Sequence, residues 1–287
     1  MAGNVTPGFW GRAFGATQGR DFSNTVAPPL GLDGFDTEFD NNFNQDIYGV
    51  MGGLDFGRES LSEQGNQAWI FGVFGGYTGS NLDFDESDTE VDYEAGSIGA
   101  YVTYLNGGLF VDGTIKADFG KMDYSSDGDS ASADFTSIGG VVDAGYRMTM
   151  ASGWFVEPKA TLAYVNTNFD NLEVFGTDVE FEDGDSFRGR LGARVGTMFE
   201  RNGVVIEPYV EASAWNEFDG DYSASFFSNG TGFEPGFDAD GVYGEVALGA
   251  SFINAGNGWS AFAKGAAQFG EDSMWGVTGN LGIRKTW

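Results

Sequence analysis

The side chains that could do chemistry in this chain are its charged groups, because the 287 residues include no His and no Cys. Without these residue types there is no Ser-His or Cys-His triad, no thiolate chemistry and none of the usual zinc, haem or iron–sulfur ligation. We therefore expect a protein that is not an enzyme, with no catalytic residue, no metal site and no cofactor. The Asp-rich segments 83–86 and 127–129 could hold Ca²⁺ through clustered carboxylates, but they lack the EF-hand spacing, and we interpret them as solvated surface loops.

The charged residues follow a period of two along the chain. In the segment 187–200, Arg188, Arg190 and Arg194 lie at even positions, whereas the odd positions are mainly apolar, as at Leu191. This period separates the two faces of a β-strand and cannot come from an amphipathic helix. The same parity assigns a set of residues to the polar face, and we predict that they line a pore: Arg12, Asp112, Lys116, Asp118, Arg147, Glu157, Lys159, Arg188, Arg190, Arg194, Glu207, Glu211, Glu245, Lys264 and Arg284, with Asp143 at the same parity.

Twelve segments of alternating polarity must position these side chains. They cover residues 8–17, 42–58, 67–79, 93–105, 108–121, 135–149, 153–166, 187–200, 203–215, 241–253, 258–269 and 274–287. Such strands are about twice as long as the 5–6 residues common in soluble sheets, and a strand of this length, tilted near 45°, spans a hydrocarbon layer. A soluble sandwich or a large lipocalin-like protein would turn the apolar face inward and would leave the strand length unexplained.

A sheet in lipid must close, because an open edge leaves backbone groups unpaired. The sequence therefore predicts an all-β fold, a 12-stranded antiparallel up-and-down transmembrane β-barrel with short periplasmic turns and long acidic extracellular loops. We expect one domain over residues 1–287, with strands at about 8–287 and residues 1–7 as the remnant of a linker. The Asn-Gly pairs at 106–107 and 202–203 predict tight hairpin turns.

Charge gives the barrel its predicted orientation. The net charge is -29, from 14 basic and 43 acidic residues, and this excludes a nucleic-acid partner. The connections near 18–41, 80–92, 122–134, 167–186, 216–240 and 270–273 hold 30 of the 43 acids and only one basic residue, Arg20. The alternate connections are short. We assign the acidic side to the cell exterior and both termini to the periplasm of a bacterial outer membrane.

Targeting and interface signals agree with an outer-membrane protein. The first eight residues show no secretory signal, so we expect a mature segment, and no run approaches the 18 apolar residues of a transmembrane helix. Several aromatic residues near strand ends predict a girdle at the bilayer interface: Trp10, Trp69, Tyr77, Tyr104, Trp154, Tyr164, Trp259, Trp275 and Trp287.

A set of short motifs, in this order, resembles the β-barrel translocator domain of autotransporters (type V secretion) over essentially the whole chain. The motifs are Trp10 with Arg12, Gly75-Gly76-Tyr77, Gly145-Tyr146, Val156-Glu157-Pro158, Arg190-Leu191-Gly192-Ala193-Arg194-Val195-Gly196, Glu207-Pro208-Tyr209 and Gly279-Asn280-Leu281-Gly282-Ile283-Arg284 before Trp287. The resemblance implies an outer-membrane pore that anchors and exports an N-terminal passenger. It also implies an assembly signal in the last strand, carried here by Leu281, Ile283 and Trp287.

Two features depart from the family pattern. Family members usually end in Phe and carry a helical linker through the lumen, whereas this chain ends in Trp287 and has about seven residues before the first expected strand. The partners implied are outer-membrane lipid and lipopolysaccharide, the barrel-assembly machinery, and the protein's own passenger or linker helix; we expect a monomer.

Two functions remain open at this point. The first is the translocator, whose lumen charges would form a salt-bridge network that fills a wet pore and packs a linker helix. The second is a monomeric 12-stranded channel or porin for small or anionic solutes, whose charges would form a selectivity ring.

Overall fold

The computed structural model describes most of the chain. The described residues are 5–20, 23–26, 37–40, 42–62, 65–85, 87–126, 128–174, 177–181, 184–219, 221–228, 231–233, 236–238, 241–270 and 273–287. Glu86 and Asp127, which belong to the two Asp-rich segments, lie outside these residues, as do parts of the connections 18–41, 167–186 and 216–240.

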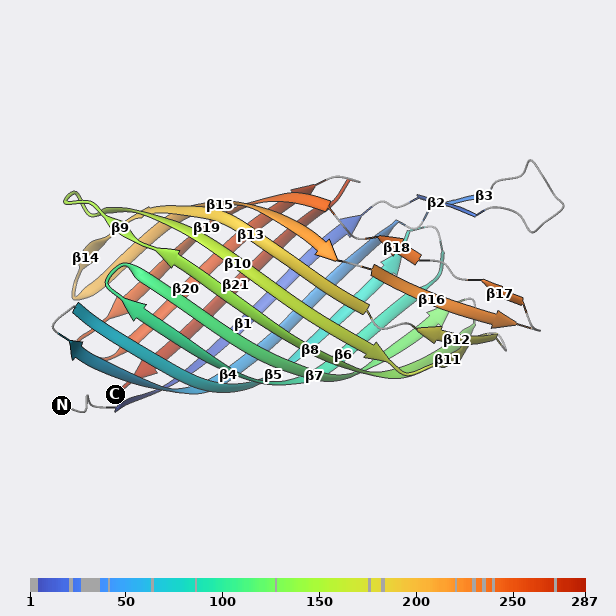
Figure 1. Cartoon of the computed structure of the whole chain (residues 1–287), viewed down its shortest axis with the longest axis horizontal. Coiled ribbons are helices and arrows are strands. Elements are labelled where there is room, and N and C mark those ends of the chain that lie inside the picture. The colour runs from blue at the N-terminus through green and yellow to red at the C-terminus, as the bar shows by residue number, and fades with distance from the viewer. Residues whose placement is uncertain are drawn as a thin grey trace.

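Twelve long antiparallel strands form one closed barrel, as the alternation predicted (Figure 1). They are β1 (Val5–Arg20), β4 (Phe43–Ser62), β5 (Gly65–Phe84), β6 (Glu90–Asn106), β7 (Leu109–Ser126), β8 (Asp129–Tyr146), β10 (Trp154–Phe169), β13 (Gly184–Thr197), β15 (Val204–Asp219), β19 (Gly241–Asn254), β20 (Trp259–Gly270) and β21 (Trp275–Thr286). Each strand pairs with the next along the chain. The barrel closes where β1 pairs with β21, from Gly8↔Thr286 to Gly19↔Trp275.

Short strands extend the barrel at both ends. β9 (Met148–Thr149) and β14 (Phe199–Arg201) lie at the end that holds both termini. The opposite end carries β2 (Ser23–Val26), β3 (Thr37–Asp40), β11 (Leu172–Val174), β12 (Thr177–Phe181), β16 (Asp221–Ser228), β17 (Thr231–Phe233) and β18 (Gly236–Asp238). Several strands, such as β1, β4, β5 and β7, are longer than the predicted alternating segments, because backbone pairing does not depend on the alternation of side chains.

The turns at the terminal end are tight. Asn202 and Gly203 both have positive φ, of 54° and 78°, as a two-residue hairpin with this Asn-Gly pair requires. The other predicted Asn-Gly turn is shifted by one residue: Asn106 still pairs with Leu109, and Gly107-Gly108 form the turn. Only Gly107 takes a positive φ in this turn. A type II′ hairpin turn needs a positive φ at the first of its two central residues alone.

The barrel is apolar on the outside. Leu191, Ile115 and Leu248 are 71%, 67% and 65% exposed, although they lie in the middle of long strands. A soluble protein rarely shows such a continuous apolar surface, and lipid would cover it. Among the expected girdle residues, Trp69, Tyr77, Trp154, Tyr164, Trp259, Trp275 and Trp287 are exposed on this outer surface.

Trp10 is an exception, and its assignment to the girdle was wrong. Its indole Nε1 donates a hydrogen bond to the Tyr101 hydroxyl at 3.0 Å, and both side chains border a cavity inside the barrel. The reason is the register of β1: Phe9, one residue earlier, takes the outward position and packs against Trp259 and Trp287.

A small apolar cluster lies at the barrel end opposite the termini. Val91, Met122 and Ala133 come from three adjacent strands, and Leu172 of β11 packs against them. Val91, Met122 and Ala133 have the parity of the polar face, so apolar side chains line part of the wall of the lumen at this end.

Candidate functional site in the barrel lumen

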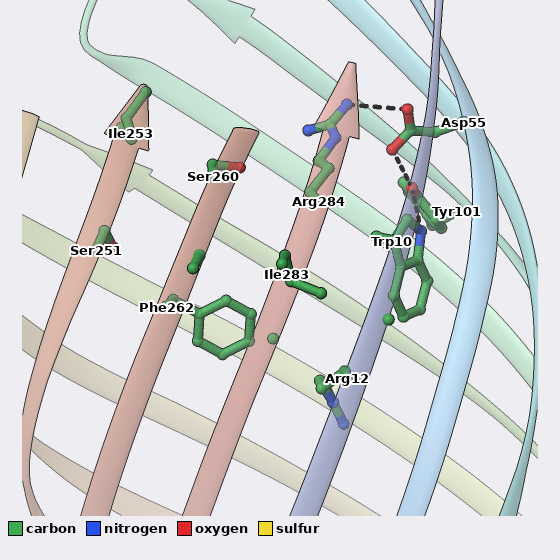
Figure 2. A pocket seen from close by; sticks show the side chains of 13 residues that line it. Trp10, Arg12, Asp55, Tyr101, Ser251, Ile253, Ser260, Phe262, Ile283 and Arg284 are labelled. Atoms are coloured by element: carbon green, nitrogen blue, oxygen red, sulfur yellow. Dashed lines mark hydrogen bonds and ion pairs between the residues drawn. The ribbon is translucent and has the colours of Figure 1, made fainter. Parts of the chain in front are cut away.

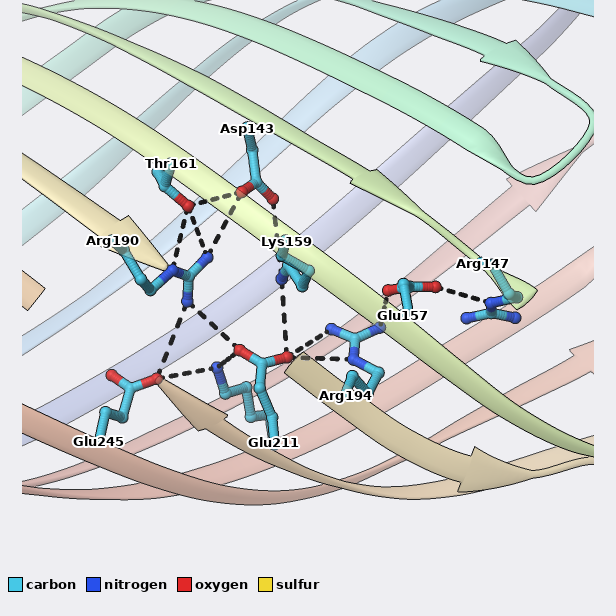
Figure 3. A network of polar contacts seen from close by, with 10 residues as sticks. Asp143, Arg147, Glu157, Lys159, Thr161, Arg190, Arg194, Glu211 and Glu245 are labelled. Atoms are coloured by element: carbon cyan, nitrogen blue, oxygen red, sulfur yellow. Dashed lines mark hydrogen bonds and ion pairs between the residues drawn. The ribbon is translucent and has the colours of Figure 1, made fainter. Parts of the chain in front are cut away.

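An ion-pair network around Glu211 occupies one side of the lumen (Figure 3). Glu211 lies on β15, and its side chain is only 1% exposed. Four basic groups surround its carboxylate: Lys159 at 3.6 Å, Arg190 at 3.3 Å, Arg194 at 3.0 Å and Lys264 at 3.2 Å. These bases come from β10, β13 and β20, so one carboxylate connects side chains across the interior of the barrel.

The local sequence explains why these groups meet. Arg194 is paired in register with Glu157 on one neighbouring strand and with Glu211 on the other. Side chains directly opposite each other on one face of a sheet lie close enough to interact. The row Glu157–Arg194–Glu211 is therefore built by the register of β10, β13 and β15.

The network continues toward the terminal end of the barrel. The Arg147 guanidinium donates to Glu157 at 2.6 Å and to Glu207 at 3.3 Å. Arg147 also stacks over the Phe155 ring at 4.2 Å. Arg194 bridges the two parts, because it contacts Glu157 at 3.4 Å as well as Glu211.

The opposite flank of the network is centred on Arg190. This residue contacts Asp143 at 3.5 Å and Glu245 at 3.9 Å, and it donates to the Thr161 hydroxyl at 2.9 Å. Lys159 contacts the second oxygen of Asp143 at 3.7 Å. Every charged member of the network thus has an opposite charge nearby, which offsets the cost of removing charges from water.

The charges of the network balance. Its five acids are Asp143, Glu157, Glu207, Glu211 and Glu245, and its five bases are Arg147, Lys159, Arg190, Arg194 and Lys264. A balanced set of fixed ions produces a weak net field but keeps the lumen polar and hydrated. Such an arrangement suits a wet interior that does not trap one sign of charge strongly.

The remaining residues on the polar face do not join this network. Lys116 pairs with Asp118 at 2.9 Å, Asp112 accepts hydrogen bonds from two threonine hydroxyls, and Arg188 lies 3.7 Å from Glu217. Arg12 stacks over the Phe14 ring at 5.3 Å.

A second polar cluster was not anticipated from the sequence. Asp55 is 1% exposed, and it accepts hydrogen bonds from Arg284 and from the Tyr101 hydroxyl, each at 3.0 Å. With Trp10 these groups border a cavity of about 350 Å³ near the terminal end (Figure 2). Asp55 stands between two apolar residues of the outer face, Leu54 and Phe56, so the period of two could have identified it.

Among the described residues, no group of three or more Asp or Glu side chains is arranged to hold a metal ion. The residues that the structure describes include no helix long and apolar enough to cross a membrane.

Comparison with known proteins adds independent information. A family profile described as the autotransporter beta-domain matches residues 9–266. The pertactin autotransporter of Bordetella bronchiseptica is 27% identical over 288 residues, which cover 98% of this chain and 29% of that protein. The chain thus spans about 29% of the length of this relative.

Solved structures share the fold. The β-domain of the Bordetella autotransporter BrkA aligns over 98% of this chain and 100% of its own, with a TM-score of 0.74 and 20% identity. The transport unit of the Escherichia coli autotransporter AIDA-I aligns over 97% of this chain and 90% of its own, with a TM-score of 0.76 and 15% identity.

Proposed function

Because this chain belongs to the autotransporter β-domain family, we propose that its barrel is the outer-membrane translocator that anchors and exports an N-terminal passenger. One observation carries the proposal: a closed wall that is apolar outside encloses a polar interior with balanced charges. Lipid can solvate the first surface, and water and a polar polypeptide can occupy the second.

The lumen charges have a role in this proposal. The fifteen residues predicted to line the pore, together with Asp55, Asp143 and Glu217, provide fixed hydrogen-bond donors and acceptors along the interior. A passing chain can exchange water-mediated contacts with them without a large desolvation cost. Because the five acids and five bases of the Glu211 network are paired with one another, this network favours neither sign of charge in a passing segment. No step of this role needs a catalytic group, so we also propose that the barrel itself is not an enzyme.

The closing strand supports a further part of the proposal. Leu281, Ile283 and Trp287 are 62%, 49% and 66% exposed on the outside of β21 and its end. An apolar edge of this kind is available to the barrel-assembly machinery before closure. In the membrane the same face contacts lipid, with lipopolysaccharide expected in the outer leaflet, and a closed monomer leaves no strand edge for a second copy.

A surface-display experiment tests the translocator role. An epitope-tagged segment is joined ahead of residue 5, and the fusion is expressed with a signal sequence. We expect the epitope to reach the cell surface, where antibody and added protease act on intact cells. Heat-modifiable migration of the barrel serves as the folding control.

The channel alternative predicts a different result. A barrel that inserts correctly but leaves the epitope in the periplasm would contradict the translocator. An ion conductance in planar bilayers that is unaffected by the fused segment would then support a solute channel.

A further inference from the structure

One arginine in the lumen has no matching carboxylate among the residues that the structure describes. Arg12 on β1 is exposed to the lumen, where its guanidinium stacks over the Phe14 ring. Within the described part of the chain, no Asp or Glu lies within ion-pair distance of Arg12. The other eight basic residues of the polar face each have a carboxylate oxygen at 3.7 Å or less.

Arg12 borders a hollow of about 400 Å³ together with two more cations. Arg194 on β13 and Lys264 on β20 line the same space, although β1 is several strands away from β13 around the barrel. No carboxylate is among the described residues that line it. Two aromatic residues, Tyr209 and Phe262, also line the space, and the neutral side chains of Ser251 and Asn280 can donate hydrogen bonds into it.

The charged residues that line this space are all basic. Arg194 and Lys264 both contact Glu211, whose side chain is 1% exposed and does not line the hollow. The carboxylates that contact Arg194 and Lys264, which also include Glu157 and Glu245, lie outside the lining of the hollow. Arg12 adds a positive charge that no carboxylate of the described residues pairs. Arg194 also lies over the Tyr209 ring at 4.2 Å, which restricts its guanidinium to this position.

The neighbouring cavity has a different character. It shares Arg12, Ser251 and Phe262 with the hollow, but its second cation, Arg284, is already bound to Asp55 at 3.0 Å (Figure 2). An anion in this cavity would compete with Asp55. In the hollow, by contrast, Arg12 has no carboxylate partner among the described residues, and the carboxylates that contact Arg194 and Lys264 do not line the space.

We propose that the hollow between Arg12, Arg194 and Lys264 is an anion-binding site for a ligand with more than one carboxylate. Guanidinium groups bind carboxylates through paired, charge-assisted hydrogen bonds, and three converging cations favour a ligand with several negative oxygens. The carboxylates come either from a free small molecule or from acidic side chains of a polypeptide segment in the lumen. The site does not depend on the translocator role.

Its position has a consequence for stability. Arg12 is on β1, Asn280 is on β21, and Lys264 is on β20, so three of the groups flank the seam where the barrel closes. Arg194 adds a contact from β13. A ligand that joins these strands binds only the closed barrel, and it therefore raises the unfolding temperature.

Calorimetry on the full chain, folded in detergent micelles, tests the site with citrate as the probe. We expect saturable binding of one citrate per barrel, weakened by added salt. Arg12→Gln should weaken it at least tenfold, and Arg12→Lys, which keeps the charge but loses the planar fork, should weaken it less. The matched control is Lys116→Gln, because Lys116 is a lumen cation paired with Asp118 on β7, and it should leave citrate affinity unchanged.

A peptide pair identifies the source of the carboxylates. One peptide carries two glutamates one helical turn apart, and the other carries glutamines at those positions. Binding of the glutamate peptide but not of citrate assigns the site to a polypeptide, and the reverse assigns it to a free solute. The proposal is overturned if neither probe binds saturably, or if Lys116→Gln weakens binding as much as Arg12→Gln. Citrate should also raise the transition temperature of heat-modifiable migration in the unmodified protein and in Lys116→Gln, but not in Arg12→Gln.

Discussion

Substitution Glu211→Gln should destabilise the barrel more than any other loss of one lumen carboxylate in the network. Glu211 is shared by four cations, and its side chain is 1% exposed. Removing one partner of a buried ion pair typically costs about 3–5 kcal/mol, because the other charge is left uncompensated.

The structure places the expected loss at the low end of that range. Each of the four cations keeps another carboxylate: Lys159 and Arg190 keep Asp143, Arg194 keeps Glu157, and Lys264 keeps Glu245. One excess positive charge is thus spread over four groups in a partly wet lumen. We expect a loss of about 3 kcal/mol in the free energy of unfolding.

The assay is urea-induced unfolding in detergent or lipid, followed by tryptophan fluorescence and by heat-modifiable migration. The matched control is Asp118→Asn, because Asp118 pairs with one lysine on its own strand whose side chain is 34% exposed, and it should cost about 1 kcal/mol or less. A double-mutant cycle with Lys264→Gln should show a coupling energy of about 1 kcal/mol or more. Equal losses for Glu211→Gln and Asp118→Asn, or no coupling with Lys264, would refute the view that Glu211 holds the network together.

Three further predictions test the outer face, the packing of the wall and the closing strand. Leu191→Arg should lower the free energy of unfolding in lipid by about 2–4 kcal/mol, because it places a charge on the outer surface at mid-strand. Arg12→Ala, on the lumen side, should lower it by less than about 1 kcal/mol. Similar losses for the two variants in urea titrations would mean that the faces are reversed. Gly72→Ala should cost about 1–3 kcal/mol, because its new Cβ would lie 2.3 Å from the Tyr101 ring and displace the hydroxyl that donates a hydrogen bond to Asp55. Gly279→Ala, with no atom within 4 Å of its Cβ, should be nearly neutral, and thermal unfolding compares the two variants. Deletion of Trp287 should reduce outer-membrane insertion in cells but leave refolding in detergent intact, because this exposed ring contacts only Phe9 among the described aromatic residues. Membrane fractionation measures the insertion, and unchanged insertion would count against the proposed assembly signal.

The alternation of side chains was enough to predict the barrel. Residues such as Leu191 and Val195 face outward, and Arg190 and Arg194 face inward, because a strand turns successive side chains to opposite sides whatever surrounds it. Twelve such segments, too long for a soluble sheet, then require closure. The same alternation assigns Asp55 to the polar face, although it was not among the predicted pore-lining residues. It also assigns Trp10 to the face of Arg12, where the structure has it, although the position of Trp10 near a strand end suggested the bilayer interface.

The tertiary structure alone decided which charges meet. Glu211 and Lys264 are 53 residues apart, and Asp55 and Arg284 are 229 residues apart, yet each pair is in contact. A period of two is a local property of one strand, and it assigns a face but no partner. Partners depend on the register between strands and on the curvature of the closed barrel, which brings side chains from non-adjacent strands together across the interior. For the same reason no local pattern distinguishes Arg12, the lumen cation without a described carboxylate partner, from the eight that are paired.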